Sequence, residues 1–301
     1  MLLEPKNARM KRALQTARNA AFSDATVLLT GEAGTGKRTL ARAIHFWGTR
    51  RSGPFAAVSC GSLGEPLIER EIFGTIEEYA SDVAMDAGGQ LRQAAGGTLL
   101  LDEIGDLSRR LQTRLLRFLD DRPLRSPATV RIIASSSRNL EAETVVGSFR
   151  QDLYHCLNVV DITVPPLRER LEDLPALVDQ ILAAYAALAS QPPLVLEPEA
   201  AAALAAYPWP GNLHQLIEIL EHAASHCTGH RIGTSDLPGP LRSSASTAEH
   251  NDLPEPIQNL ESVERRHIER VLADCPTLEE AAARLGIGST TLWRKRKRYG
   301  F

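Results

Sequence analysis

A glycine-rich segment at residues 31–37 constrains the fold of this chain more than any other feature. It reads Gly-Glu-Ala-Gly-Thr-Gly-Lys and lies between a short apolar run at 25–30 and a helical pattern at 39–47. Glycines in such a turn direct backbone N–H groups at phosphate oxygens, and the lysine and the helix N-terminus add positive charge. The segment therefore predicts a phosphate-binding loop, with a glycine turn that binds nothing as the plainer alternative.

The loop and the start of the next helix supply nine expected nucleotide-binding residues. They are Gly31, Glu32, Ala33, Gly34, Thr35, Gly36, Lys37, Arg38 and Thr39. The pattern G-x-x-x-x-G-K is complete, but Arg38 stands where a Ser or Thr usually binds magnesium. Thr39 comes one position too late to be a simple substitute. We expect ATP or ADP at this loop, without the usual hydroxyl ligand for magnesium.

Two carboxylates follow a second apolar run and predict the catalytic half of the site. Residues 97–101 read Gly-Thr-Leu-Leu-Leu and end in Asp102 and Glu103. Hydrolysis of a nucleoside triphosphate needs a metal and an activated water. We predict that Asp102 orients Mg²⁺ bound with the nucleotide and that Glu103 polarises the water; a solvated turn is the alternative. Arg150 is a further catalytic candidate, able to reach a neighbouring subunit's γ-phosphate, although a surface salt bridge explains it equally well.

Strands and helices alternate along the first part of the chain, which predicts an α/β domain with a parallel sheet. The expected strands are 25–30, 56–60, 97–103, 130–134 and 159–164. After Pro166 the pattern changes to helices only, expected at 172–188, 197–207 and 212–227. We therefore expect an α/β domain at 1–166, a small helical domain at 167–238, a linker at 239–256 and a last helical domain at 257–301.

The last domain has the pattern of a helix–turn–helix. Gly286 ends one helix and Ser289 can cap the next. The residues expected to contact DNA are Ser289, Thr290, Thr291 and Arg294 near base edges and Arg296, Lys297 and Arg298 at phosphates. Leu292 and Trp293 are expected to pack rather than to contact bases. The alternative is a basic tail that only improves solubility.

Composition excludes several other classes of protein. The 301 residues carry a net charge of −3, and no apolar run is long enough to span a bilayer. Cys60, Cys156, Cys227 and Cys275 are too scattered for a disulfide framework or a zinc site, which predicts a reducing cytoplasm. The histidines at 222, 226 and 230 are expected at a solvated helix end, because no further ligands complete a metal site.

At this point a family resemblance becomes visible. Six segments resemble, in order, the AAA+ domain of sigma-54-dependent transcriptional activators: 31–37, 71–74, 96–105, 149–153, 165–170 and 207–212. The C-terminal domain resembles the Fis-type DNA-binding domain of the same family. The resemblance implies an AAA+ P-loop fold with a helical lid, ring oligomers, and ATP hydrolysis that remodels the sigma-54 RNA polymerase. It also implies a homodimer contact through the helix at 257–273, and hence a palindromic double-stranded DNA site.

Two loops depart from the family pattern. The window that carries the sigma-contacting signature GAFTGA reads Glu-Tyr-Ala-Ser-Asp-Val at 78–83, without either glycine. The second contacting loop, at 120–129, is several residues shorter than usual. These changes predict a regulator that acts independently of sigma-54.

Four residues depart from the family's hydrolytic apparatus. Ser59 and Ser137 replace asparagines, Cys156 replaces a second arginine finger, and His214 replaces the sensor arginine of the lid at the nucleotide. An arginine finger is worth roughly a thousandfold in rate or more, and neither Cys nor a largely neutral His replaces its charge. We predict retained nucleotide binding, with His214 beside the nucleotide, and weak or absent hydrolysis.

The resemblance leaves alternatives open. The chain starts almost directly at the AAA+ domain, so the input signal is expected to come from elsewhere rather than from a receiver domain. One alternative is an active ATPase that works with sigma-54 and RNA polymerase. Others are a sensor of cyclic di-GMP and a subunit of mixed AAA+ rings that borrows arginines from an intact relative.

Overall fold

The computed structural model describes residues 4–74, 89–120, 129–189, 192–227, 229–239 and 241, and in the C-terminal region 268, 272, 277–284, 287–288, 292–293 and 295. Contacts divide the chain into two compact units, Met1–Ser246 and Thr247–Phe301. The domain boundaries expected at 166 and 238 inside the first unit stay predictions.

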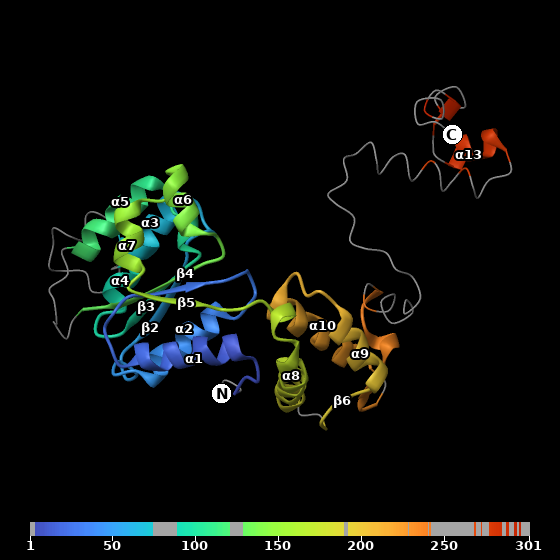
Figure 1. Cartoon of the computed structure of the whole chain (residues 1–301), viewed down its shortest axis with the longest axis horizontal. Helices are drawn as coiled ribbons and strands as arrows, with labels where there is room; N and C mark the ends of the chain where they lie inside the picture. The colour runs from blue at the N-terminus through green and yellow to red at the C-terminus, as the bar shows by residue number, and fades with distance from the viewer. Residues whose placement is uncertain are drawn as a thin grey trace. The chain divides into compact units, whose positions relative to one another are not determined.

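The first unit is built on a parallel five-stranded sheet (Figure 1). Its strands are β1 (Val27–Thr30), β2 (Phe55–Ser59), β3 (Thr98–Asp102), β4 (Arg131–Ser136) and β5 (Val160–Thr163). The order is β2-β3-β4-β1-β5, and every neighbouring pair is parallel. The predicted α/β class with a parallel sheet is thus confirmed. Because parallel strands share one carboxyl edge, the ends of β1, β3 and β4 lie side by side.

Helices cover both faces of this sheet (Figure 1). One face packs against α1 (Ala8–Ala21) and α2 (Lys37–Trp47). The other packs against α3 (Glu65–Phe73), α4 (Gln90–Gln93), α5 (Arg109–Asp120), α6 (Leu140–Val146) and α7 (Gln151–Leu157). Side chains alternate between the two cores, as β geometry requires: Leu99 and Leu101 point to the second face and Leu100 to the first.

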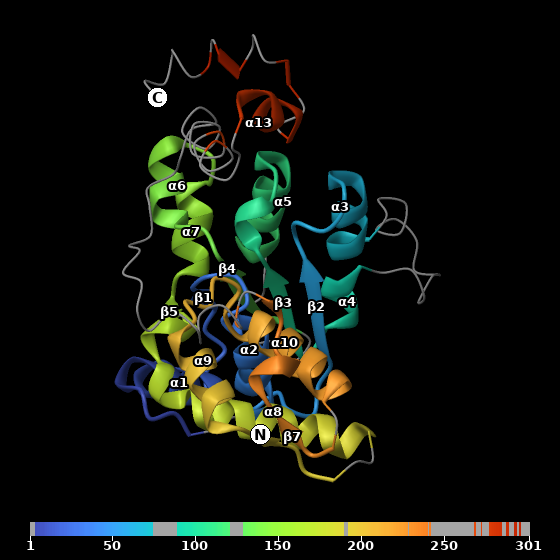
Figure 2. The same ribbon diagram turned by 90° about the vertical axis from the view of Figure 1, so that its right-hand side faces the viewer.

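The helical part of the first unit contains α8 (Leu174–Ala189), α9 (Pro198–Ala206) and α10 (Asn212–His226), seen in front of the sheet in Figure 2. Trp209 is fully buried at its centre and donates its indole N–H to the Leu204 carbonyl at 2.9 Å. The expectation of helices only is wrong here, because β6 (Val195–Leu196) pairs in parallel with β7 (Arg231–Ile232). Strands of this length are too short to leave a periodic pattern in the sequence.

The second unit contains α13 (Leu278–Arg284) and a small apolar core. Ile268, Ala281, Ala282 and Leu292 are buried together. The expectation that Leu292 packs is confirmed, whereas Trp293 is 58% exposed and does not join this core. Consecutive helical residues point about 100° apart, so a core this small admits one of the two. None of the helices in the described part of the chain is long and apolar enough to cross a membrane.

A buried histidine predicts that stability depends on pH. His45 of α2 is 2% exposed, and its Nδ1 lies 2.9 Å from Thr98 Oγ1. Burial, and next the positive charge of Arg131, hold the pKa of His45 below its ordinary value of 6.5. The unfolded state therefore binds more protons than the folded state as the pH falls below about 6.5. The free energy of unfolding should decrease over that range.

Urea denaturation between about pH 7 and pH 5 checks this expectation, with His45→Gln as the comparison because glutamine keeps polar atoms but does not titrate. The variant should lose part of the decrease seen in the wild type. Equal pH dependence in both proteins would contradict the assignment.

Candidate nucleotide site

The glycine-rich loop connects β1 to α2 and needs glycine at specific places. Gly31 and Gly34 adopt φ values of 141° and 76°. A Cβ on Gly31 would lie 2.4 Å from the Val164 carbonyl oxygen, and one on Gly34 would lie 2.4 Å from the Gly211 carbonyl oxygen. Both contacts are with backbone that cannot move aside cheaply. The glycines therefore set the turn and also let the helical part of the unit approach it.

Lys37 lies in the first turn of α2 with its amino group inside the loop. The side chain is 5% exposed. Its Nζ donates to the carbonyls of Gly31 at 2.8 Å and Glu32 at 3.1 Å, and forms an ion pair with Glu103 Oε1 at 3.0 Å. A buried ammonium held by two carbonyls and one carboxylate is placed to bind phosphate oxygens, so the residues present fit a nucleotide phosphate chain.

The two predicted carboxylates lie at the carboxyl end of β3, beside the end of β4. Ser135 donates its hydroxyl to Asp102 Oδ1, and the backbone N–H of Glu103 donates to Ser135 Oγ at 3.2 Å. Glu103 has φ 53° and ψ 56°, the left-handed region that a non-glycine residue rarely occupies. Such a conformation costs about 1–3 kcal/mol and persists mainly at functional sites. It turns the Glu103 side chain toward Lys37.

Ser137 completes the surroundings of Glu103. Its backbone N–H and its hydroxyl donate to Glu103 Oε2 at 2.7 and 2.8 Å. Burial raises the pKa of Glu103, but the hydrogen bonds from Ser137 and Lys37 outweigh it, so the pKa lies below its ordinary value. Glu103 is therefore an ionised carboxylate, able to accept a proton. Ser59 pairs with Asp102 in the strand register, one strand further along the same edge.

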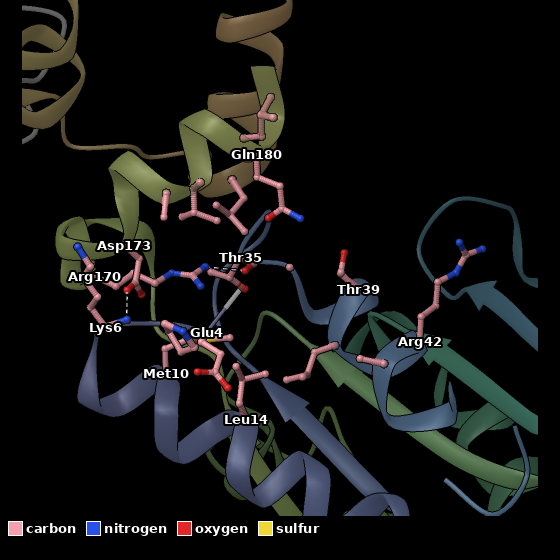
Figure 3. Close-up of a pocket in the computed structure, with 18 of the residues that line it drawn as sticks. Glu4, Lys6, Met10, Leu14, Thr35, Thr39, Arg42, Arg170, Asp173 and Gln180 are labelled. Carbon is pink, nitrogen blue, oxygen red and sulfur yellow. Dashed lines mark hydrogen bonds between the residues drawn. The ribbon is translucent and has the colours of Figure 1, made fainter. Parts of the chain in front are cut away.

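A pocket of about 520 Å³ opens beside the loop, between α1, α2, α8 and α10 (Figure 3). Its wall includes Thr35, Gly36 and Thr39 of the predicted site. Its apolar lining includes Met10, Leu14, Leu40, Phe46, Leu177, Ile181 and Ile217. An apolar cavity that adjoins a phosphate loop suits a flat base. Sequence reasoning missed these side chains because they come from four helices and form no motif.

The two remaining candidates lie differently with respect to the loop. The backbone N–H of His214 donates to the Gly34 carbonyl at 3.3 Å, but its side chain is 75% exposed and its Nε2 lies 3.2 Å from Glu218 Oε1. Arg150 pairs with Asp152, with Nη2 and Oδ2 2.6 Å apart, and donates to Thr113 Oγ1 at 3.2 Å. The salt bridge considered for Arg150 is thus present in the single chain.

Several predicted features fall outside the described residues. They are the window at 78–83, residues 121–128 of the shortened loop, and the expected DNA contacts Ser289, Thr290, Thr291, Arg294, Arg296, Lys297 and Arg298. Arg38 and Thr39 are described, and both side chains are exposed on the first turn of α2.

A parallel sheet in this strand order, a glycine loop after β1, an acidic end to β3 and a helical unit over the loop define a P-loop nucleotide-binding protein of the AAA+ class. Residues 3–163 match the sigma-54 interaction domain, residues 168–254 the AAA+ ATPase lid domain, and residues 259–299 the Fis family of bacterial regulatory proteins. The chain belongs to the sigma-54 interaction domain family, and transcriptional regulatory proteins are among its relatives.

Known relatives share this arrangement over most of the chain. The alginate biosynthesis transcriptional regulatory protein AlgB of Pseudomonas aeruginosa is 40% identical over 305 residues, covering 99% of this chain and 67% of AlgB. The regulatory protein AtoC of Escherichia coli is 36% identical, covering 93% of this chain and 64% of AtoC. The crystal structure of NtrX from Brucella abortus in complex with ATP is 31% identical, covers 100% of this chain and 70% of NtrX, and has a TM-score of 0.73.

Proposed function

We propose that this protein is a DNA-binding transcriptional regulator whose AAA+ domain binds ATP or ADP, hydrolyses ATP weakly, and acts independently of sigma-54. One observation carries the proposal. Lys37 is buried at the centre of an intact phosphate loop, while the positions that assist hydrolysis in this family hold Ser137, Cys156 and His214. Binding and turnover therefore depend on different residues, and the binding residues are the ones retained.

Nucleotide binding is supported by the loop, the Lys37 ammonium and the adjoining apolar pocket. The relative NtrX was solved in complex with ATP and in complex with ADP. Asp102 is the residue that would hold Mg²⁺ arriving with the nucleotide, since its carboxylate stands at the strand edge beside the loop. The ion would neutralise phosphate charge there. Arg38 offers no hydroxyl for the same purpose.

Weak hydrolysis is supported by the chemistry of the residues that differ from the family pattern. Glu103 remains ionised and is held by Ser137 and Lys37, so a base is present. A base alone leaves the charge that develops on the transferred phosphoryl group unbalanced. Cys156 carries no guanidinium, and the His214 side chain pairs with Glu218 at the surface. Of the two arginine-finger positions of the family, the one at Arg150 keeps an arginine that could act on a neighbouring subunit's nucleotide.

Independence from sigma-54 is supported by the sequence of the two contacting loops. The window at 78–83 lacks both glycines of the family signature and gains two acids, and the loop at 120–129 is shortened. Because the Fis-type domain is expected to bind DNA as a dimer, its DNA site would be palindromic. The protein would assemble as a homodimer or as an AAA+ ring, and RNA polymerase would be a partner. Because its proposed partners are DNA and RNA polymerase, we place the protein in the cytoplasm.

Calorimetric titration of the purified protein with ATP and ADP tests the first half of the proposal. Both should bind, and phosphate release at saturating ATP should remain well below the roughly 1 s⁻¹ at which typical enzymes begin. Titration with cyclic di-GMP under the same conditions tests the alternative ligand. Rapid hydrolysis by the assembled protein would contradict the proposal and show that the protein is an active ATPase.

Transcription in vitro tests the second half. A target promoter should respond to the protein with the housekeeping polymerase and should not require sigma-54. A response that depends on sigma-54, together with ATP hydrolysis, would identify a conventional activator. Hydrolysis that arises only after mixing with an intact relative would instead identify a subunit of mixed rings.

A further inference from the structure

The part of the chain that forms α1 and α2 carries a strong surplus of positive charge. Residues 5–64, which include both helices, contain ten lysines and arginines but only two acids, Asp24 and Glu32. The rest of the chain has more acids than bases, and the whole chain has a net charge of −3. Positive charge is therefore concentrated in one part of the molecule, a distribution that indicates an anionic partner.

These cations gather on one side of the sheet. Figure 1 shows α1 and α2 together on the side away from α5, α6 and α7. Both acids of the segment are already paired: Asp24 Oδ1 lies 2.7 Å from Arg50 Nε, and Glu32 pairs with Arg168. Five exposed cations pair with no carboxylate of the described residues, and we call them the basic face: Lys6, Lys11, Arg12, Arg42 and Arg51.

The exposed side of α1 has the composition of a phosphate-binding surface. The helix contains no acidic residue, and it exposes Gln15, Thr16 and Asn19 between its cations. Arginine, lysine, glutamine, threonine and asparagine side chains are among the donors that contact DNA phosphates. The 14 residues of α1 span about 21 Å, which is the length of about six base pairs of duplex DNA. The helix can therefore face several phosphates at once.

Neighbouring groups hold some of these cations in place without neutralising them. The guanidinium of Arg42 lies over the Phe55 ring, with Cζ 5.6 Å from the ring centroid. Such a contact fixes the direction of the side chain and leaves its charge available. Arg9 and Arg18 of α1 add two further exposed cations beside the basic face, although both lie near carboxylates. The basic face is thus a surface of unneutralised donors.

We propose that the basic face binds the phosphate backbone of double-stranded DNA in the flanks of the site that the Fis-type domain holds. The inference rests on the proposed DNA binding and adds a second DNA contact, on the AAA+ domain. DNA is the polyanion that the Fis-type domain would bring to a high local concentration at the same chain. Because phosphates carry no sequence information, this second contact is independent of sequence and strongly dependent on salt.

Two double variants of the full chain test this assignment. Lys11→Gln with Arg12→Gln removes two charges from the basic face. Arg109→Gln with Arg117→Gln removes two exposed charges from α5, on the opposite side of the sheet, and is the matched control. The probe is a random-sequence duplex of about 60 base pairs, which extends well beyond two half-sites one helical turn apart. The first variant should bind it about tenfold more weakly than the wild type, and the control should bind it equally well.

Salt dependence and duplex length identify the contact. The slope of log affinity against log salt concentration should be shallower by about 1.8 in the first variant, for two lost phosphate contacts. On a duplex of about 20 base pairs, which holds only the two half-sites, the same variant should bind as the wild type does.

Lysine acetylation supplies a readout that is independent of affinity. Residues 1–246 contain three lysines, of which Lys6 and Lys11 are exposed and Lys37 is buried. The long duplex should protect Lys6 and Lys11 from acetic anhydride, and the short duplex should not. Lys37 should stay unreactive throughout.

The outcomes separate this inference from the proposed DNA binding. Equal affinities and equal slopes in the two folded double variants, with a wild type that binds DNA, would overturn the inference and leave the proposed DNA binding intact. A preference for single-stranded DNA that the first variant loses would overturn it too, because the exposed rings of Phe22 and Phe46 would then stack on bases. So would binding to phosphatidylserine vesicles that the first variant loses without any loss of DNA affinity. If the wild type binds neither duplex, the proposed DNA binding fails and the inference fails with it.

Discussion

Replacement of Lys37 by alanine is expected to lower the affinity for ATP and ADP by about a hundredfold. The ammonium is the one buried positive charge that the described residues place inside the loop. Its removal leaves the Glu103 carboxylate facing the phosphates without its partner, so repulsion is added to the lost attraction. The glycine turn and the apolar pocket remain, which is why some affinity should survive.

Calorimetry on Lys37→Ala, with Arg51→Ala as the control, measures this effect. Arg51 is an exposed cation in the turn after α2 and lies outside the candidate site, so its loss should leave the affinity unchanged. Circular dichroism establishes that both variants fold. Wild-type affinity in a folded Lys37→Ala protein would mean that nucleotide does not bind at the loop, and would remove the basis of the proposed function.

The local motifs of this chain could be predicted because their signals are short and contiguous. The loop at 31–37 is followed at once by α2, and the run before Asp102 is β3, as the strand and helix patterns require. Whether a helix could be predicted depended on its length. Helices α4, α6 and α7 have four to seven residues, too few for a clear period, and were not predicted.

The arrangement around the loop could not be predicted, since it depends on contacts between distant residues. Glu32 is 136 residues from Arg168 and 180 from Asn212. In the sequence each looks like an ordinary charged or polar residue near a proline or glycine. The left-handed turn at Glu103 is equally hidden, because only glycine signals such a conformation by its identity. Sequence reasoning identified the acid but not its ion pair with Lys37.

The Ser137 contact refines the interpretation of the hydrolytic apparatus. From the sequence, Ser137, which replaces an asparagine of the family, counts among the changes that weaken hydrolysis. In the structure Ser137 donates twice to Glu103 and so keeps the base ionised and oriented. The deficit for hydrolysis then lies less in the base than in the missing cations near the nucleotide. That distinction leads to a prediction about which substitutions restore turnover.

A variant that carries Cys156→Arg, His214→Arg and Ser137→Asn should hydrolyse ATP faster than the wild type by about a hundredfold or more. Cys156 lies on α7, the helix that begins after Arg150, and is partly buried against the core, so an arginine there can extend its guanidinium toward solvent and a neighbouring subunit. The backbone of His214 already bonds to the Gly34 carbonyl, so an arginine side chain at this position would start beside the phosphate loop.

Phosphate release at saturating ATP, at protein concentrations that permit assembly, measures the gain. The same triple variant with Lys37→Ala added should lose it, which separates restored chemistry at this site from a contaminating ATPase. Cys156→Arg alone should give most of the increase, since a guanidinium in the transition state is worth far more than a better-placed amide. A triple variant that folds, binds ATP as the wild type does and still turns over no faster would place the limitation in ring assembly rather than in these residues. That result would favour the reading in which this chain serves a mixed ring and an intact relative supplies the arginines.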